Sequence, residues 1–319
     1  MSFISPPRAT AATLYFIGVT TKASSIRTVF PRWAGELGID AVLDGMDLPV
    51  HAPVEDYRAA VRAIADDPLA MGALVTTHKV DLYTACADMF DVIDPLAELM
   101  GEVSCISKDG DKLVAHAKDP FSSGYAIDHI LGGSYWQDTP GEAFIMGAGG
   151  SGIAIAWYLT RPSLGLNRPR RLIVSNRSKP RTDNFRRIYE KMDTGVPLEL
   201  VVAGTPDVND RLLELCGPGS LVVNATGLGK DAPGSPLTKA CRFPHRAVAW
   251  DLNYRGDLGF LEQARAQADQ RALRVEDGWF YFLHGWIQAI AEVFHRDVPV
   301  SGPAFDRLSE LARSVRRPS

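Results

Sequence analysis

The sequence predicts an α/β protein built from two successive domains. Its 319 residues are enough for two domains of ordinary size. Short apolar runs alternate with segments of helical periodicity, a pattern typical of mostly parallel sheets covered by helices. A glycine-rich loop between an apolar run and a helical segment, at residues 147–152, indicates a Rossmann-type nucleotide fold in the second domain.

The first domain is expected to span residues 1–128. Apolar runs predict strands, and helical spacing predicts helices; the strands are expected at 14–17 and 72–76, and the helices at 25–37, 57–65 and 80–89. Pro31 should interrupt the first helix or delay its start, because proline lacks the N–H that a helix interior requires.

The second domain is expected to span residues 129–277, after turn signals near 128–140. Five predicted strands with helical patterns between them indicate a doubly wound sheet; they lie at 143–146, 171–175, 198–202, 221–224 and 247–251. A long apolar helix at 278–294 follows, and the closing segment 278–319 is expected to pack back onto the first domain.

Composition excludes several classes of protein. Hydrophobic residues make up 46%, charged residues 23%, and the net charge is −4, so a compact protein without a nucleic-acid footprint is expected. No apolar run approaches the roughly 18 residues that a membrane span needs. The apolar segment 11–19 lacks a preceding basic segment and is interpreted as a strand, so we expect a cytoplasmic protein, monomeric or homodimeric, with a small-molecule substrate. The four cysteines are expected to be reduced and structural, and no ligand spacing indicates a metal site.

The glycine loop carries the first functional signal. Its spacing is G-x-G-x-x-G, and it follows a predicted strand and opens a predicted helix. Glycine permits a tight turn and close approach of a diphosphate, which the helix N-terminus attracts. A purely structural glycine turn is the alternative. The expected cofactor contacts here are Gly147, Gly149, Gly150, Ser151 and Gly152.

The end of the next strand predicts which cofactor binds. NAD sites place an acidic residue about 20 residues beyond the glycines, to hold the ribose 2′-hydroxyl. The sequence has no acid there; it has Asn176, Arg177 and Ser178, with Arg181 close by. Arginine favours a 2′-phosphate, so NADP is the expected cofactor, although a solvated loop with two arginines fits the same residues.

With these cofactor motifs, the sequence resembles the shikimate dehydrogenase family. The resemblance runs along nearly the whole chain and is strongest in the second domain. Residues 176–181 resemble N-R-T/S-x-x-R, residues 223–229 resemble V-N-A-T-x-x-G, and residues 251–254 resemble D-x-x-Y. The resemblance implies NADP-dependent shikimate 3-dehydrogenase chemistry, as in aromatic amino acid biosynthesis. It adds further cofactor contacts, namely Asn224, Ala225, Thr226 and Gly227.

In the first domain the resemblance is partial. Residues 75–79 resemble V-T-x-P-x-K with one residue fewer and no proline, which makes Lys79 the family's lysine. Asp119 stands at the aspartate of N-T-D. The other substrate contacts that the resemblance implies are Ser24, Thr76, Ser104, Tyr254 and Gln288.

The departures concentrate in the implied substrate pocket. Ile26, followed by Arg27, replaces the family's second serine, and Ser104 replaces an asparagine. The family's glutamine aligns with Gly285, while Gln288 lies one helical turn further on. Because unmatched polar groups reject a substrate strongly, the resemblance predicts the reaction type better than the substrate.

Hydride reduction of a carbonyl needs a proton for the developing alkoxide. The resemblance implies that Lys79 supplies it and that Asp119 orients the lysine and binds a substrate hydroxyl. Sequence order alone also fits a surface Lys79 that opens one helix and an Asp119 that caps the next.

The sequence is compatible with three functions. The first is an NADP-dependent alcohol dehydrogenase or ketoreductase acting on a small cyclic hydroxy acid. The second is a Rossmann dehydrogenase acting on another carbon, such as a folate-type methylene carrier. The third is a catalytically lapsed protein that binds NADP and senses it.

Overall fold

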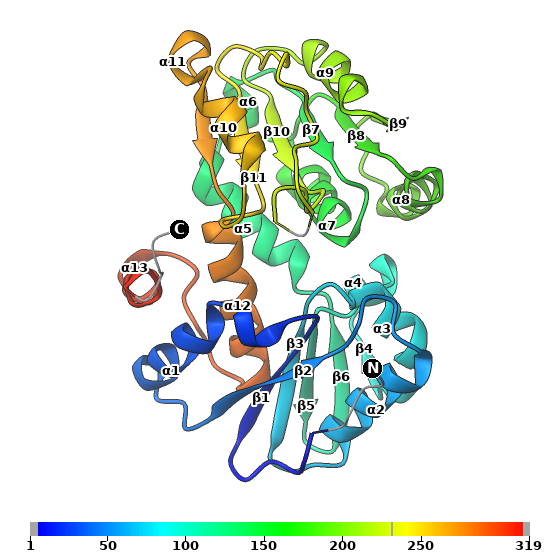
Figure 1. The fold of residues 1–319 in the computed structure, drawn as a ribbon, viewed down its shortest axis with the longest axis vertical. Coiled ribbons are helices and arrows are strands. Elements are labelled where there is room, and N and C mark those ends of the chain that lie inside the picture. The colour runs from blue at the N-terminus through cyan, green and yellow to red at the C-terminus, as the bar shows by residue number, and fades with distance from the viewer. Residues whose placement is uncertain (1–5, 231, 315–319) are drawn as a thin grey trace. The chain divides into compact units, whose positions relative to one another are not determined.

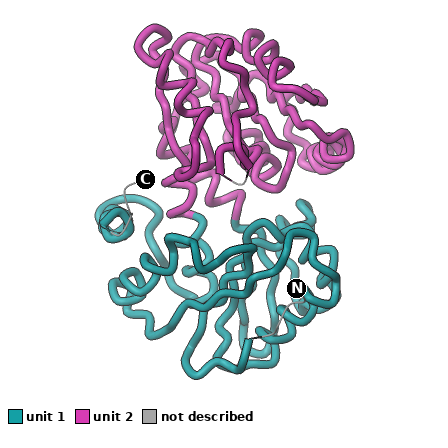
Figure 2. The backbone as a smooth tube through the Cα atoms, viewed as in Figure 1, with its two compact units in different colours: residues 1–118, 285–318 teal, residues 119–284, 319 magenta. Residues whose placement is uncertain are grey.

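The computed structural model describes residues 6–230 and 232–314. The chain forms two compact units (Figure 2): unit 1 holds the residues up to 118 and those from 285 onward, and unit 2 holds residues 119–284. The first division therefore falls before residue 119, whereas the sequence suggested residue 128. No helix among the described residues is both long and apolar enough to cross a membrane.

Unit 1 contains a six-stranded sheet in the order β2-β1-β3-β5-β6-β4 (Figure 1). Its strands are β1 (Thr13–Gly18), β2 (Val42–Asp47), β3 (Ala70–Val75), β4 (Val92–Ile93), β5 (Cys105–Asp109) and β6 (Lys112–His116). Its helices are α1 (Ile26–Leu37), α2 (Val54–Ala65), α3 (Lys79–Cys86), α4 (Pro95–Met100) and α13 (Gly302–Arg313), with the last part of α12 (Trp279–Val293).

The sheet of unit 1 is mixed. The pairs β1–β2, β1–β3 and β4–β6 are parallel, but β5 runs antiparallel to both β3 and β6. The hairpin joining β5 and β6 turns at Gly110, whose φ is 59°, a left-handed conformation that suits glycine. Neither strand of this hairpin is among those expected from the sequence, although Asp109-Gly110 is a recognised hairpin signal.

Helix α1 runs through Pro31 and is not interrupted there. Proline has no N–H to donate to the carbonyl one turn earlier in the helix. Because Pro31 is exposed, water can hydrogen-bond to that carbonyl instead. The inner face of α1 is buried, and the indole Nε1 of Trp33 donates a hydrogen bond to Leu308 O at 2.8 Å. This bond and the surrounding packing attach α13 to unit 1.

Unit 2 contains a six-stranded parallel sheet in the order β12-β11-β10-β7-β8-β9 (Figure 1). Its strands are β7 (Ala143–Met146), β8 (Leu172–Asn176), β9 (Leu198–Val202), β10 (Leu221–Asn224), β11 (Val248–Asp251) and β12 (Arg274–Glu276). Its helices are α5 (Asp119–Leu131), α6 (Tyr135–Asp138), α7 (Gly150–Thr160), α8 (Lys179–Met192), α9 (Pro206–Glu214), α10 (Gly259–Arg265) and α11 (Ala268–Arg271), with the first residues of α12.

This strand order is that of a Rossmann fold whose first strand is β7, and it reverses direction between β7 and β10. The five strands predicted in this half are confirmed. The sixth, β12, was missed because it has three residues and no fully buried side chain, so it carries no apolar run. Ligands of such sheets bind beyond the carboxyl ends of the strands at the reversal, which places the glycine loop at the expected position.

Helix α5 belongs to unit 2 because it packs closely on α7. A Cβ atom at Gly124 would lie 1.8 Å from the Tyr158 ring, so only glycine allows this approach. The Tyr158 hydroxyl also donates a hydrogen bond to Asp128 Oδ2 at 2.5 Å. These contacts explain why the division between the units precedes α5.

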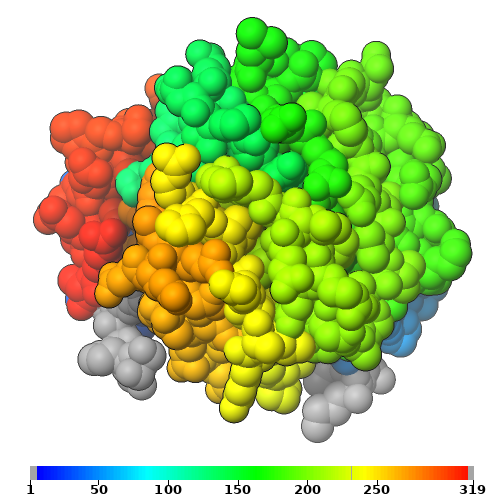
Figure 3. All heavy atoms as spheres, turned by 90° about the horizontal axis from the view of Figure 1, so that it is seen from above, coloured from blue at the N-terminus to red at the C-terminus, as the bar shows by residue number. Residues whose placement is uncertain are grey.

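The chain after β10 is held against α10 by side-chain amides. Gln263 Nε2 donates to Leu237 O and Thr238 O, and Gln267 Nε2 donates to Cys241 O at 3.0 Å. Figure 3 shows the yellow atoms of this part of the chain next to the orange atoms of the later residues that include α10 and α11. Residues 237–241 are therefore held against α10.

Candidate functional site

The glycine loop has a geometry that only glycine permits at two positions. Gly147 follows β7 with φ 122°, and a Cβ there would lie 2.4 Å from Ala225 O. A Cβ at Gly152 would lie 2.1 Å from Gly147 O. The chain thus turns tightly into α7, whose first N–H groups have no carbonyl partner within the helix and attract an anion.

The end of β8 presents two guanidinium groups to solvent. The Ser178 N–H donates to Asn176 Oδ1 at 2.9 Å, which shapes the turn into α8. Arg177 and Arg181 are exposed, and neither forms an ion pair within the described residues. Arg181 Nη1 lies 3.5 Å from the position of a Cβ on Gly149, so this guanidinium is next to the glycine loop.

The end of β10 forms a tight turn organised by a buried asparagine. Asn224 Oδ1 accepts from the Thr226 N–H at 3.1 Å and from Thr226 Oγ1 at 2.6 Å. The N–H of Ala225 donates to Met146 O at 2.8 Å, and Gly227 has φ 78°. These bonds place the predicted contacts of the V-N-A-T segment beside the glycine loop.

Asp251, at the end of β11, is fully buried and lies against the same turn. Its Oδ2 accepts from Asn224 Nδ2 at 3.0 Å, and its Oδ1 accepts from the Asn253 N–H at 2.8 Å. Burial raises the pKa of Asp251 to about 6, while these hydrogen bonds oppose the rise and the charge of Asp277 adds to it. Asp251, the aspartate of the D-x-x-Y segment, therefore links the end of β10 to the end of β11 by hydrogen bonds.

The start of α12 is fixed on the end of β11. A Cβ at Gly278 would lie 1.9 Å from Leu252 O, and the Gly278 N–H donates to Asn253 O at 3.0 Å. The Trp279 N–H is capped by Asp277 Oδ1 at 2.9 Å. The ring of Tyr254 packs against those of Trp279 and Phe282, with centroids 5.5 and 4.9 Å away.

The first turn of α12 also supplies a polar group that sequence reasoning missed. The Tyr281 hydroxyl donates to Asp119 Oδ2 at 3.1 Å and lies 3.1 Å from Ser151 Oγ. The apolar run around Tyr281 suggested helix packing alone. The sequence could have indicated this hydrogen bond, because the hydroxyl of a tyrosine in a largely buried helix usually finds a hydrogen-bond partner.

In unit 1, a strained turn precedes the lysine candidate. The His78 N–H donates to Thr76 O at 2.5 Å, and the intervening Thr77 has φ 60°, which is uncommon for a β-branched residue. The turn is one residue shorter than the motif it resembles. Lys79 is the first residue of α3, and its carbonyl accepts from the Val103 N–H at 3.0 Å.

His78 and its neighbours form a hydrogen-bonded group behind this turn. His78 is buried, and its Nδ1 lies 3.0 Å from the Tyr57 hydroxyl, which also donates to Asp81 Oδ2 at 3.3 Å. Burial lowers the pKa of His78 below its usual value, so the imidazole is neutral at physiological pH. This group fixes the start of α3, and with it the backbone of Lys79.

The remaining substrate-contact candidates of unit 1 differ in their surroundings. Thr76 Oγ1 lies 3.1 Å from the position of a Cβ on Gly18, so Thr76 borders the start of the segment 18–24 that ends at Ser24. The Ser104 hydroxyl accepts from the Lys118 N–H at 2.7 Å and donates to His116 O at 3.4 Å. Gln288 lies on α12 and is partly exposed.

Ile26 and Arg27, at the position of the family's second serine and directly after it, have different surroundings. Ile26 is fully buried in the core at the start of α1. Arg27 extends to β2, where its Nη1 lies 3.5 Å from Asp44 Oδ1. Lys79 belongs to unit 1 and Asp119 to unit 2, and their pairing remains a prediction.

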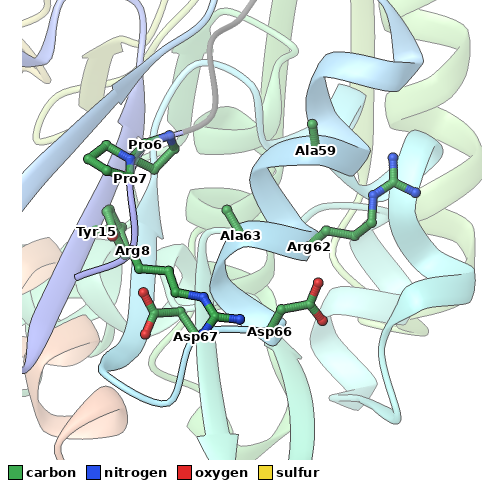
Figure 4. A pocket seen from close by; sticks show the side chains of 9 residues that line it. All are labelled: Pro6, Pro7, Arg8, Tyr15, Ala59, Arg62, Ala63, Asp66 and Asp67. Carbon is green, nitrogen blue, oxygen red and sulfur yellow. The ribbon is translucent and has the colours of Figure 1, made fainter.

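Unit 1 also has an open cavity of about 330 Å³ at the amino end of β3 (Figure 4). It is lined by Pro6, Pro7, Arg8, Tyr15, Ala59, Arg62, Ala63, Asp66 and Asp67. Thr76 and Lys79 follow the opposite, carboxyl end of β3, and none of the candidate site residues lines this cavity. Within the described residues, no group of three or more histidine, cysteine, aspartate or glutamate side chains could hold a metal ion.

Strand order, the glycine loop and the two arginines after β8 define unit 2 as a Rossmann-type dinucleotide-binding unit.

No protein-family model matches the chain. A curated relative, shikimate dehydrogenase (NADP(+)) of Lactococcus lactis subsp. cremoris, is 25% identical over 56% of this chain and 60% of its own length. The shikimate dehydrogenase (NADP(+)) of Methylobacterium radiotolerans is 26% identical over 88% of this chain and 89% of its own.

Solved structures show the same fold. The shikimate dehydrogenase of Thermus thermophilus, solved with NADP(H) and shikimate, is 22% identical with a TM-score of 0.68, covering 95% of this chain and 99% of that one. The fold class predicted from the sequence is confirmed. The resemblance found in the motifs is confirmed as well: the protein is shikimate dehydrogenase-like in sequence and in fold.

Proposed function

We propose that the protein is an NADP-dependent oxidoreductase that transfers hydride between NADP(H) and a C–OH/C=O group of a small cyclic hydroxy acid. The observation that carries the proposal is the glycine loop of unit 2, with Arg181 beside it and Arg177 directly after β8. The relatives named shikimate dehydrogenase (NADP(+)) support both the cofactor and the reaction class.

The residues of unit 2 fit this dinucleotide. A side chain at Gly147 or Gly152 would collide with the backbone of the same loop region, so the tight turn into α7 depends on glycine, and the N-terminus of α7 favours a diphosphate. Arg177 and Arg181 have the charge and the planar donor geometry for a 2′-phosphate, which an acidic residue in that place would repel. Bound NADP(H) supplies or accepts the hydride; the other steps depend on this chain.

We propose that Lys79 acts as the acid/base group. A protonated lysine stabilises a developing alkoxide and donates its proton during reduction, and a neutral lysine removes the proton during oxidation. The strained turn at Thr77 supports this role, because strained backbone concentrates at functional sites. Asp119 orients the ammonium and accepts from a substrate hydroxyl.

The surroundings of the substrate candidates favour a substrate other than shikimate. Ile26 offers no hydroxyl and is buried in the core, Ser104 is bonded to the backbone, and Arg27 pairs with Asp44. Three groups that could bind ring hydroxyls or a carboxylate are thus absent or engaged. A cyclic substrate with fewer polar groups matches this unit better.

Cofactor titration tests the proposal. NADPH and NADH are titrated into the wild type by following nicotinamide fluorescence, and into Arg177→Asp. A charged hydrogen bond contributes about 1.5–3 kcal/mol, so the variant should lose at least about tenfold in NADPH affinity and little in NADH affinity. Arg186→Asp, an exposed position further along α8, is the matched control for the charge change. Equal affinity of the wild type for both cofactors would contradict the proposal.

A further inference from the structure

The Tyr281 hydroxyl connects the glycine loop with Asp119. Its distances to Ser151 Oγ and Asp119 Oδ2 are both 3.1 Å, and all three residues belong to unit 2. A carboxylate only accepts hydrogen bonds, so the Tyr281 proton points to Asp119. The tyrosine oxygen is then left to accept the proton of Ser151. The order of donation is Ser151 to Tyr281 to Asp119.

The position of this hydroxyl is set by rigid parts of unit 2. The Tyr281 ring meets Trp250 of β11 edge to face, with centroids 6.3 Å apart, and Trp250 is fully buried. One turn earlier, Gly278 fixes the start of α12 on β11. A ring held at its edge and at its helix keeps its hydroxyl in one place, which is what a positioning group requires.

Ser151 lies in the first turn of α7, where the proposed diphosphate binds. Its single proton can be donated to Tyr281 or to an anion, but not to both at once. While Asp119 is charged and holds the Tyr281 proton, Tyr281 competes with the diphosphate for the Ser151 proton. Cofactor binding and the hydrogen bonding of Asp119 are therefore linked, and such linkage is reciprocal.

We infer that Tyr281 is a positioning residue that orients the Asp119 carboxylate and couples it, through Ser151, to occupancy of the dinucleotide loop. The inference rests on the proposed function for the role of Asp119 and for the identity of the dinucleotide. Nothing in the motifs that the chain shares with its relatives assigns a role to this hydroxyl.

A double-mutant cycle in NADPH affinity tests the coupling. Asp119→Ala removes the acceptor of the Tyr281 proton, so Tyr281 can donate to Ser151, Ser151 can turn its own proton to the diphosphate, and NADPH should bind more tightly. In Tyr281→Phe the same substitution should act only through the loss of one negative charge. Coupled neighbours typically deviate from additivity by about 0.5–3 kcal/mol, so we expect the two effects to differ by about threefold or more.

A second pair of residues controls for general effects of such substitutions. Tyr158 and Asp128 form another tyrosine–aspartate hydrogen bond between α7 and α5. The cycle of Tyr158→Phe with Asp128→Ala should be additive in NADPH affinity. Ser151→Ala offers an independent route if Tyr281→Phe folds poorly, since Ser151 is partly exposed. In Ser151→Ala, as in Tyr281→Phe, Asp119→Ala should act only through the loss of one negative charge.

The outcomes separate this inference from the proposed function. Additive NADPH affinities in the cycles that pair Asp119 with Tyr281 and with Ser151 would overturn the coupling. Failure of NADPH to bind the wild type would overturn the proposed function and the coupling together. The Asp119–Tyr281 cycle, repeated in free energy of unfolding without ligand, tests the positioning bond alone, and additivity there would overturn it.

Discussion

Replacing Asp251 with asparagine should change how stability depends on pH. Burial raises the pKa of this carboxyl from its ordinary value of 3.8 to about 6. A difference of one pH unit between folded and unfolded pKa values corresponds to about 1.4 kcal/mol, so ionising Asp251 in the folded protein costs about 3 kcal/mol of stability.

The sign follows from the direction of the shift. Because the folded pKa is raised, the folded state binds more protons between pH 4 and pH 6 than the unfolded chain. The stability contributed by the protonated carboxyl is fully present below about pH 4 and is lost as the pH rises through about 6. Between pH 5 and pH 7.5 the wild type should lose about 1.4 kcal/mol relative to Asp251→Asn.

The assay is urea denaturation of both proteins at several pH values. The new amide can still accept from the Asn253 N–H, but its NH₂ group faces Asn224 Nδ2, which lowers stability by an amount that does not vary with pH. Only the slope of the difference is therefore diagnostic. Asp183→Asn, at an exposed site on α8, controls for the loss of one charge. A difference curve that is flat from pH 5 to pH 7.5 would refute the reasoning.

Three further predictions follow from the burial and backbone geometry of other residues. Gly147→Ala places a Cβ 2.4 Å from Ala225 O at a residue with a left-handed φ of 122°, so urea denaturation should show a free energy of unfolding lower by about 2–5 kcal/mol. A decrease below about 1 kcal/mol would mean that the turn relaxes easily. Ellman's reagent should label none of the four cysteines of the native protein within minutes and all four in urea, because they are buried. Burial raises the pKa of each thiol, to about 12 for Cys86 and Cys216 and to about 11 for Cys241, and labelling before unfolding would contradict this prediction. Ile26→Ser should lower stability by about 2–5 kcal/mol and confer no shikimate activity, since Ile26 is a core residue; robust wild-type kcat/KM for shikimate would show that the substrate site has been misread.

The fold was predictable where local pattern and tertiary structure agree. The bounds of β7 and β10 match the predicted strands residue for residue, because each is a short buried run set off by turn residues. The prediction failed where tertiary contacts decide. The hairpin of β5 and β6 has few uninterrupted apolar residues, and α1 continues through Pro31 because that position faces water.

The candidate site shows the same division. Glycines and arginines at the ends of β7 and β8 were identifiable because their spacing reflects a backbone requirement. The link from Ser151 through Tyr281 to Asp119 was not, because it joins residues up to 162 positions apart in the sequence through one hydroxyl. Likewise, Ser104 looked like a substrate contact, and only the structure reveals that its hydroxyl bonds to the backbone at residues 116 and 118.

The central claim is that this chain catalyses NADP-dependent hydride transfer with Lys79 as acid/base. The most direct measurement is absorbance at 340 nm with NADP and a panel of cyclic hydroxy acids, and with NADPH and the matching ketones, for the wild type and Lys79→Ala. We expect turnover of at least one pair by the wild type, a fall of about 10² to 10⁴ in kcat for Lys79→Ala, and unchanged NADPH affinity. NADPH binding without turnover of any compound in the wild type, or near-native turnover in a folded Lys79→Ala variant, would contradict the account.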